Sequence, residues 1–229
     1  MAGAGAGADG SSVMRLLDLF CGAGGAAMGY HQAGFDVVGV DIKPQPRYPF
    51  EFHQTDAMTF PLDGFDVIHA SPPCQRYSAI THVSGNRNDH PDLIAKVRRR
   101  LRLLGLPYVI ENVVGAPLHD PVLVCARMFD LRFERYVLRR HRLFESNVSI
   151  VGTGCHCAPG DGPTVGIYGG GNSTKPRLSG GGRPYKASRD EAGQIMGTPW
   201  MLKTEMNEAI PPAYTEFIGA QVKQLLVPP

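Results

Sequence analysis

The stretch RLLDLFCGAGG, residues 15–25, decides the fold class of this chain. A short apolar run ends in a cluster of glycines, as a buried parallel strand ends at the turn that leads into a helix. The following residues, 25–34, predict that helix, closed by Gly34. Further strands are predicted at 36–41, 65–72 and 107–113, and a further helix at 92–105. This alternation indicates an α/β fold with a doubly wound, mostly parallel sheet and with ligand-binding residues at the carboxyl ends of its strands.

Composition limits the class of protein. The 229 residues are 43% hydrophobic and carry a net charge of +2, which is enough for a core but does not by itself indicate a nucleic-acid partner. No apolar run has the length of a membrane span, and the first twelve residues lack the pattern of a signal peptide. Five cysteines, an odd number, indicate reduced thiols and a cytoplasmic protein.

The chain changes character after Phe144. Gly, Pro and Ser dominate residues 151–186, which predicts an irregular insert. Order returns with a helix over 188–197, where Ser188 and Glu191 form a capping-box pattern, and with a helix over 210–226 that begins at proline. The predicted organisation is a disordered tail (1–12), a main domain (13–144), a small insert (145–187) and a C-terminal segment that returns to the main domain (188–229).

The glycine turn predicts a nucleotide-type ligand. Gly22, Gly24 and Ala27 fit the G-x-G-x-x-G/A pattern of dinucleotide sites, and Asp41 follows at about the distance of a ribose-binding acid. However, Asp18 lies just before the turn, where a carboxylate disfavours a pyrophosphate and favours a cationic ligand such as S-adenosylmethionine. The turn alone leaves NAD and S-adenosylmethionine both open.

A second motif, SPPCQ at residues 71–75, follows another predicted strand. Two prolines stiffen the backbone before Cys74, and a rigid, accessible thiol is suited to act as a nucleophile. Glu111 ends the next strand, where a carboxyl group could face the same pocket. By contrast, Cys125 lies in an apolar run and is expected to be a packing residue. A thiol and a carboxyl group beside a site for an alkyl donor indicate covalent activation of an unreactive carbon.

With these motifs the chain resembles the DNA (cytosine-5) methyltransferase family. The motifs DLFCGAGG, SPPCQ, ENV, RRHR and AIPPAYTEFIG occur in the order found in that family, from about Met14 to the C-terminus and faintly over 145–187. The resemblance implies the Rossmann-like fold of S-adenosylmethionine-dependent methyltransferases. It also implies S-adenosyl-L-methionine as the cofactor, and methyl transfer to C5 of a flipped-out cytosine through a Cys74 adduct.

The resemblance implies a role for particular residues. The catalytic set comprises Cys74, Glu111, Arg140 and Arg142, with Glu111 holding the base and the two arginines contacting it and its surroundings. The cofactor set comprises Asp18, Phe20, Gly22, Gly24, Gly25, Asp41, Ile42, Asp56, Ala57 and Pro72, although Asp56 could simply cap a turn. The DNA-binding set comprises Gln75, Ser78, Asn112, Lys175, Arg177 and Arg183, although Gln75 and Asn112 could instead support the catalytic residues without touching DNA.

Some features carry no predicted role or depart from the family pattern. No metal site is expected, because Cys155, His156 and Cys157 are adjacent, and His141 is expected to point away from Arg140 and Arg142. The arginines at 98–102 are expected on a solvated helix face. Asn207 and Glu208 stand where the family usually has a glycine-asparagine pair.

The expected partner is duplex DNA, bound by a monomer; no membrane association is expected, and the sequence leaves open whether a restriction partner exists. The short insert predicts a recognition site of a dinucleotide or less. Two alternatives stay open: the tRNA-directed branch of the same family, and a DNA-binding relative without catalytic activity. An NAD-dependent oxidoreductase is disfavoured because no hydride-transfer site follows the glycine turn.

Overall fold

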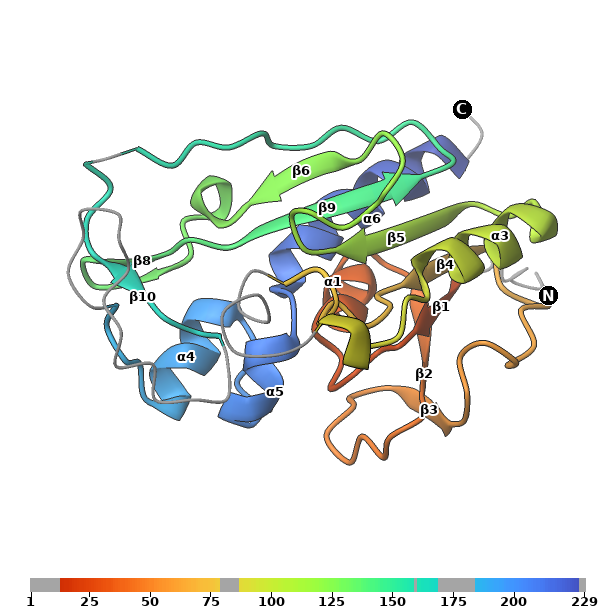
Figure 1. Cartoon of the computed structure of the whole chain (residues 1–229), viewed down its shortest axis with the longest axis horizontal. Coiled ribbons are helices and arrows are strands. Elements are labelled where there is room, and N and C mark those ends of the chain that lie inside the picture. The colour runs from red at the N-terminus through yellow and green to blue at the C-terminus, as the bar shows by residue number, and fades with distance from the viewer. Residues whose placement is uncertain (1–12, 79–86, 159, 169–183, 227–229) are drawn as a thin grey trace, which may run out of the picture.

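The computed structural model of the chain describes residues 13–78, 87–158, 160–168 and 184–226. Its main feature is a seven-stranded sheet with the order β3-β2-β1-β4-β5-β9-β6 (Figure 1). Strands β3, β2, β1, β4 and β5 are parallel to one another, whereas β9 is antiparallel to both β5 and β6. These strands are β1 (Arg15–Leu19), β2 (Asp36–Asp41), β3 (Glu51–Gln54), β4 (Val67–Ala70), β5 (Tyr108–Asn112), β6 (Val122–Cys125) and β9 (His141–Ser146). The predicted doubly wound, mostly parallel α/β fold is confirmed.

Helices cover both faces of this sheet. The helices of the described residues are α1 (Gly25–Gln32), α3 (Ile94–Leu104), α4 (Arg189–Met196), α5 (Lys203–Glu208) and α6 (Pro212–Leu226), with short 3-10 turns at η1 (Arg87–Asp89) and η2 (Ala126–Phe129). Helices α1 and α6 contribute to one core with Leu16, whereas α3 packs in the other with Leu17 (Figure 1). Adjacent β1 residues serve opposite cores because side chains alternate along a strand.

The close packing of α1 against α6 depends on a glycine. A Cβ at Gly29 would lie 2.0 Å from the Pro212 carbonyl oxygen and 2.2 Å from Thr215 Oγ1. The Thr215 hydroxyl also donates to the Ala26 carbonyl at 2.8 Å. The C-terminal helix is thereby held against the helix that follows the glycine turn.

A second, three-stranded sheet has the order β10-β8-β7, formed by β7 (Arg132–Phe133), β8 (Tyr136–Leu138) and β10 (Thr164–Val165). Strand β9 continues the main sheet to Ser146, and β10 joins the small sheet, so parts of the predicted insert are ordered into both sheets. The division at residues 144 and 187 stays a prediction. The capping box at Ser188 and Glu191 is present.

Helix α3 differs from expectation at Arg98. Arg98 does not lie on a solvated face: its side chain is 8% exposed and forms two 2.7 Å hydrogen bonds with Glu145, which is 2% exposed. Its guanidinium also donates to the Pro117 carbonyl. Arg100 is partly enclosed and donates to the Ala57 and Phe60 carbonyls, while Arg99 is exposed as expected. Arg98 is buried because Glu145, on β9, supplies the countercharge.

No helix in the described part of the chain is long and apolar enough to cross a membrane.

Candidate active site

The thiol of Cys74 lies just beyond the carboxyl end of β4. Asn112, at the end of β5, donates from Nδ2 to the Pro72 carbonyl at 2.9 Å, and Ser71 N–H donates to the Leu19 carbonyl. The Cys74 carbonyl accepts from Tyr77 and Ser78 N–H groups, so a turn begins at the cysteine. Its thiol is half-buried and free of disulfide bonding. Neighbouring strands therefore fix the backbone at Ser71 and Pro72, just before the cysteine.

Glu111 and Arg142 form a buried ion pair beside this thiol. Arg142 Nε lies 2.9 Å from Glu111 Oε1. The two groups form a close ion pair, but their orientation does not meet the angles of a hydrogen bond. Burial raises the pKa of Glu111, and Arg142 offsets part of that effect. Burial also raises the pKa of Cys74, Glu111 raises it further, and Arg142 lowers it. The structure thus brings three of the four predicted catalytic residues together.

Arg140, the fourth predicted catalytic residue, has a supporting position. Its guanidinium is buried and donates to the carbonyls of Ile167 at 2.9 Å and Asn207 at 2.8 Å. The Tyr214 hydroxyl donates to the Arg140 carbonyl at 2.7 Å. Burial, together with Arg142, lowers the pKa of Arg140 to about 9. The expected contact with a flipped base fits Arg142, whereas Arg140 joins β9 to the segment before α6.

The glycine turn is folded around Asp41. The Asp41 carboxylate accepts from Gly22 N–H at 3.0 Å and from Lys43 N–H at 2.9 Å. Phe20 and Gly24 have φ of 60° and 86°, which Gly24 adopts without strain. A Cβ at Gly25 would lie 2.4 Å from the Ile210 carbonyl oxygen. The turn is therefore shaped by β2 on one side and by the chain entering α6 on the other.

Asp18 is a buried carboxylate beneath this turn. It is fully buried at the end of β1, and no described group makes a hydrogen bond of good geometry with either oxygen. Burial raises the pKa of Asp18 well above its usual range and Asp41 adds to this, while Tyr48 and Ala27 N–H offset part of it. A buried carboxylate with so little compensation is suited to a cationic ligand.

The other predicted cofactor residues differ in exposure. Ile42 is 67% exposed directly after Asp41, as a residue that covers a ligand would be, and Ala57 and Pro72 are buried. Asp56 accepts from Met58 N–H at 2.8 Å, so it caps a turn, the simpler of the two roles considered for it.

Few of the predicted DNA-binding residues are at a surface that the structure describes. Gln75 and Ser78 are half-buried beside the Cys74 turn. Asn112 is buried and bonded to Pro72, which fits the supporting role that was the alternative to a DNA contact. Lys175, Arg177 and Arg183 lie outside the described residues.

Sequence reasoning missed a buried polar chain behind Glu111. His69, on β4, lies between the Tyr30 hydroxyl at 3.0 Å and Ser71 Oγ at 2.9 Å, and burial lowers the pKa of His69 to about 3. Ser71 in turn helps to lower the pKa of Glu111. The sequence shows only a histidine inside an apolar strand, and this pattern does not indicate that the histidine joins a buried hydrogen-bonded chain. Glu208, marked above only as a departure from the family pattern, lies near enough to Cys74 to raise its pKa.

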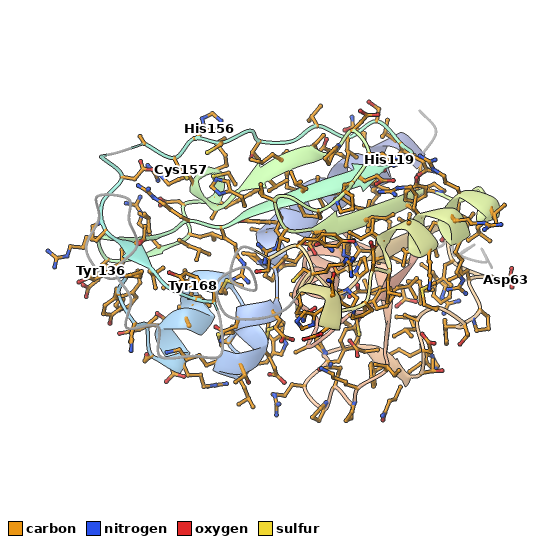
Figure 2. All side chains as sticks on the ribbon, viewed as in Figure 1. Asp63, His119, Tyr136, His156, Cys157 and Tyr168 are labelled. Carbon is orange, nitrogen blue, oxygen red and sulfur yellow. The ribbon has the colours of Figure 1, made fainter. Side chains whose placement is uncertain are left out.

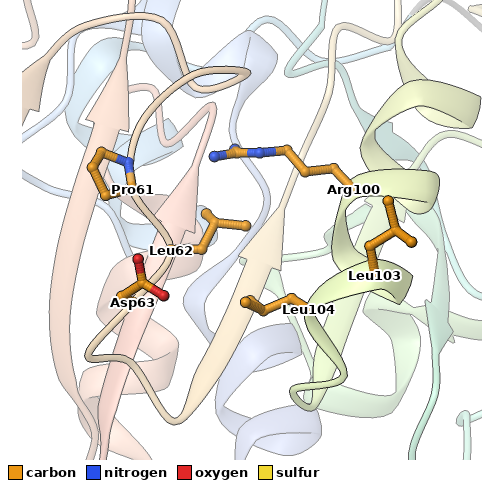
Figure 3. A pocket seen from close by; sticks show the side chains of 6 residues that line it. All are labelled: Pro61, Leu62, Asp63, Arg100, Leu103 and Leu104. Carbon is orange, nitrogen blue, oxygen red and sulfur yellow. The ribbon is translucent and has the colours of Figure 1, made fainter.

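A shallow hollow lies elsewhere, between α3 and the loop after β3 (Figure 3). Its lining residues are Pro61, Leu62, Asp63, Arg100, Leu103 and Leu104. None of them belongs to the predicted site, and the hollow contains no nucleophile or acid–base pair.

Comparison with known proteins finds relatives among DNA methyltransferases. Residues 14–124 match the family model for C-5 cytosine-specific DNA methylase. The Type II methyltransferase M1.HphI of Haemophilus parahaemolyticus is 30% identical over 142 residues, which cover 53% of this chain and 38% of the relative. The Type II methyltransferase M.HgiCI of Herpetosiphon aurantiacus is 29% identical over 124 residues, 47% of this chain and 29% of the relative. The chain thus matches well under half of either relative's length.

Solved structures share the fold over nearly the whole chain. A prophage-encoded Escherichia coli protein, proposed to be a DNA modification methyltransferase, has a TM-score of 0.60 at 16% identity, covering 93% of this chain and 99% of that one. The Dnmt2 methyltransferase of Schizosaccharomyces pombe has a TM-score of 0.57 at 13% identity, covering 93% and 100%. The chain therefore shares the fold of these methyltransferases, and its residues 14–124 match the model of the C-5 cytosine-specific DNA methylase family.

Proposed function

We propose that this protein transfers a methyl group from S-adenosylmethionine to C5 of a cytosine in duplex DNA, with Cys74 as the nucleophile. The observation that carries the proposal is the convergence of the Cys74 thiol with the Glu111–Arg142 ion pair at the ends of β4, β5 and β9. The glycine turn lies one strand away, at the end of β1, which is adjacent to β4.

The residues present fit S-adenosylmethionine. This cofactor is a sulfonium cation with an amino group and no phosphate, and Asp18 offers a buried carboxylate with little compensation from described groups. Asp41 stands beside Gly22 to receive ribose hydroxyls, and Phe20 and the exposed Ile42 can enclose a base. When bound, the cofactor supplies the methyl group that C5 receives.

The residues of the chain account for activation of the cytosine. The Cys74 thiolate forms a bond to C6, and the ring's electron pair moves toward C5, which can then attack the methyl group. Glu111, whose pKa is raised by burial, can keep a proton to share with N3 and so stabilise the ring as sulfur adds. After C5 loses its proton to a proton acceptor, the C6–S bond breaks and the C5–C6 double bond re-forms.

Arg142 and Arg140 have different roles in this mechanism. Arg142 orients Glu111 and favours the Cys74 thiolate by its charge. Arg140 is a positioning residue, because its guanidinium is used by the Ile167 and Asn207 carbonyls. A base stacked in a duplex cannot reach a thiol at this depth, so the cytosine must be flipped out.

The test is methyl transfer by the full chain. The protein is incubated with S-adenosylmethionine labelled in the methyl group and with random-sequence duplex DNA or tRNA as acceptor. Label in DNA that is lost in Cys74→Ala, with the variant's thermal midpoint unchanged, is the expected result. Label in tRNA alone would assign the substrate to RNA, and label in neither would contradict methyl transfer. Sequencing of the methylated DNA would also test the expected recognition site of a dinucleotide or less.

A further inference from the structure

A second cluster of reactive side chains lies outside the methyl-transfer site. Cys125, His141, Cys155 and Cys157 each direct one ligand atom to the same point, and these atoms all lie within 4.8 Å of one another. We propose that these four residues bind one zinc ion as a structural site. This site is independent of the proposed function, since none of its ligands belongs to the Cys74 constellation.

The fold explains how residues from three segments converge. Cys125, the last residue of β6, is the antiparallel register partner of His141, the first residue of β9, so the two side chains share a face. Because side chains alternate along β9, Arg140 and Arg142 face away from His141. Cys155 and Cys157 come from the segment after β9, two residues apart on one side of the chain.

The ligand atoms are spaced close to the edges of a tetrahedral metal site, and binding of the ion would adjust them by less than about 1 Å. Cys125 Sγ lies 3.7 Å from Cys157 Sγ, and His141 Nε2 lies 3.2 Å from Cys155 Sγ and 3.6 Å from Cys157 Sγ. With Zn–S near 2.3 Å and Zn–N near 2.0 Å, the edges of a tetrahedron are about 3.5–3.8 Å. The sulfur atoms are too far apart for a disulfide, whose S–S bond is about 2.0 Å.

The backbone around the cluster is already ordered to hold these ligands. Thr153 and Gly154 N–H groups donate to the Leu123 carbonyl at 2.9 and 3.1 Å, and Thr153 Oγ1 accepts from Cys125 N–H at 2.9 Å. These bonds hold the chain before Cys155 along the outer edge of β6, where a Cβ at Gly152 would lie 2.5 Å from the Leu123 carbonyl oxygen. The ligands therefore require little rearrangement.

Charge and chemistry both favour zinc. Three thiolates and one neutral imidazole are soft ligands that select zinc over magnesium or calcium, and with Zn²⁺ they carry a net charge of −1. Arg139 and Arg142 stand near His141, and Arg127 stands near Cys157. Cations at this distance also stabilise a negatively charged zinc–thiolate centre.

The neighbouring histidine is not a ligand. His156 is exposed and its Nε2 lies 2.8 Å from the Thr153 carbonyl, and Figure 2 shows it on the outer side of the segment, away from Cys157. The expectation of no metal site rested on the adjacency of residues 155–157. In the structure, only Cys155 and Cys157 of these three residues belong to the cluster, and Cys125 and His141 complete the set of ligands.

Four protein ligands leave no open position, so the zinc would be structural and not catalytic. It would join the start of the insert to β6 and β9. Since His141 lies between Arg140 and Arg142 in the chain, the metal would also stiffen the strand that presents Arg142 to Glu111.

The test measures metal in the full chain, purified without chelator or affinity histidines from cells supplied with zinc. Elemental analysis is expected to find one zinc per chain, in wild type and in the controls His156→Ala and Cys74→Ser. The double variant Cys155→Ser/Cys157→Ser is expected to lose it. Cobalt in place of zinc should give the intense absorption of tetrahedral cobalt with thiolate ligands.

A second readout covers the case in which the double variant folds poorly. Removal of zinc from the wild-type chain by a chelator should make Cys125, Cys155 and Cys157 newly reactive to a thiol reagent, and should lower the thermal midpoint by roughly 5 °C or more. Substoichiometric zinc in the wild type, equal zinc in the double variant, or a disulfide among these cysteines would overturn the proposal.

Discussion

The buried pair of Arg98 and Glu145 permits a quantitative prediction. The change is Arg98→Met, which keeps the apolar stem on α3 but leaves the Glu145 carboxylate, 2% exposed, without its cation. Two 2.7 Å hydrogen bonds are lost, and at about 1.5–3 kcal/mol for a bond to a charged group the cost is roughly 3–6 kcal/mol. The usual cost of breaking a buried pair, about 3–5 kcal/mol, agrees.

The assay is urea unfolding at pH 7, with Arg99→Met as the matched control on the same helix. Arg99 is exposed, so its replacement should change the free energy of unfolding by less than about 0.5 kcal/mol. Adding Glu145→Gln to Arg98→Met removes the unpaired charge but keeps an acceptor for His119 N–H, so stability should partly return.

The dependence on pH gives a second check. Burial alone would raise the pKa of Glu145, but the Arg98 guanidinium and the His119 N–H outweigh it, so its pKa lies below the ordinary value. A carboxyl group whose pKa is lowered by folding stabilises the fold above about pH 4.3. This stabilisation is lost as the pH falls through the folded-state pKa. The gap between wild type and Arg98→Met should therefore narrow below about pH 4. Equal costs for Arg98→Met and Arg99→Met at pH 7 would refute the reasoning.

Three further predictions concern the site and its support. Glu111→Gln should slow methyl transfer by roughly 10²–10⁴-fold in single-turnover kinetics, because an amide cannot share a proton with the base; an unchanged rate would remove Glu111 from the mechanism. Burial and Glu111 raise the pKa of Cys74, and Arg142 lowers it. The alkylation rate of Cys74, measured by mass spectrometry of its peptide, should therefore rise with pH around a midpoint above that of a free thiol, and around a still higher midpoint in Arg142→Met. A midpoint at or below that of free cysteine would contradict the geometry. Asn112→Ala should cost about 1–3 kcal/mol in urea unfolding by leaving the Pro72 carbonyl without its donor, and a neutral result would show that this bond does not hold the Cys74 turn.

Most of the fold and the centre of the site could be predicted because they depend on local patterns. The run at 15–25 indicates a strand, a turn and a helix within eleven residues, and the ends of parallel strands meet at one edge. Cys74 and Glu111 therefore converge as expected. Strand β3 could not be predicted in this way, because Glu51–Gln54 is a short, mostly polar edge strand without an apolar alternation.

The remaining differences depend on contacts between distant segments. Helical periodicity assigns Arg98 to solvent unless the partner on β9, 47 residues later, is known. Arg140 and Arg142 look alike in sequence, yet the carbonyls of Ile167 and Asn207 engage only Arg140. The cluster of Cys125, His141, Cys155 and Cys157 depends on the register of β6 with β9, which residue spacing does not report.

The most direct measurement of the central claim is to trap the bond between Cys74 and the base. In duplex DNA that carries 5-fluorocytosine, C5 has no proton to lose after methyl transfer, so the C6–S bond cannot break. With S-adenosylmethionine present, the account predicts a stable protein–DNA adduct whose digestion places the methylated fluorocytosine on the Cys74 peptide, and predicts none with Cys74→Ala. Methyl transfer to unsubstituted DNA with no trapped adduct, or an adduct that persists in Cys74→Ala, would contradict it.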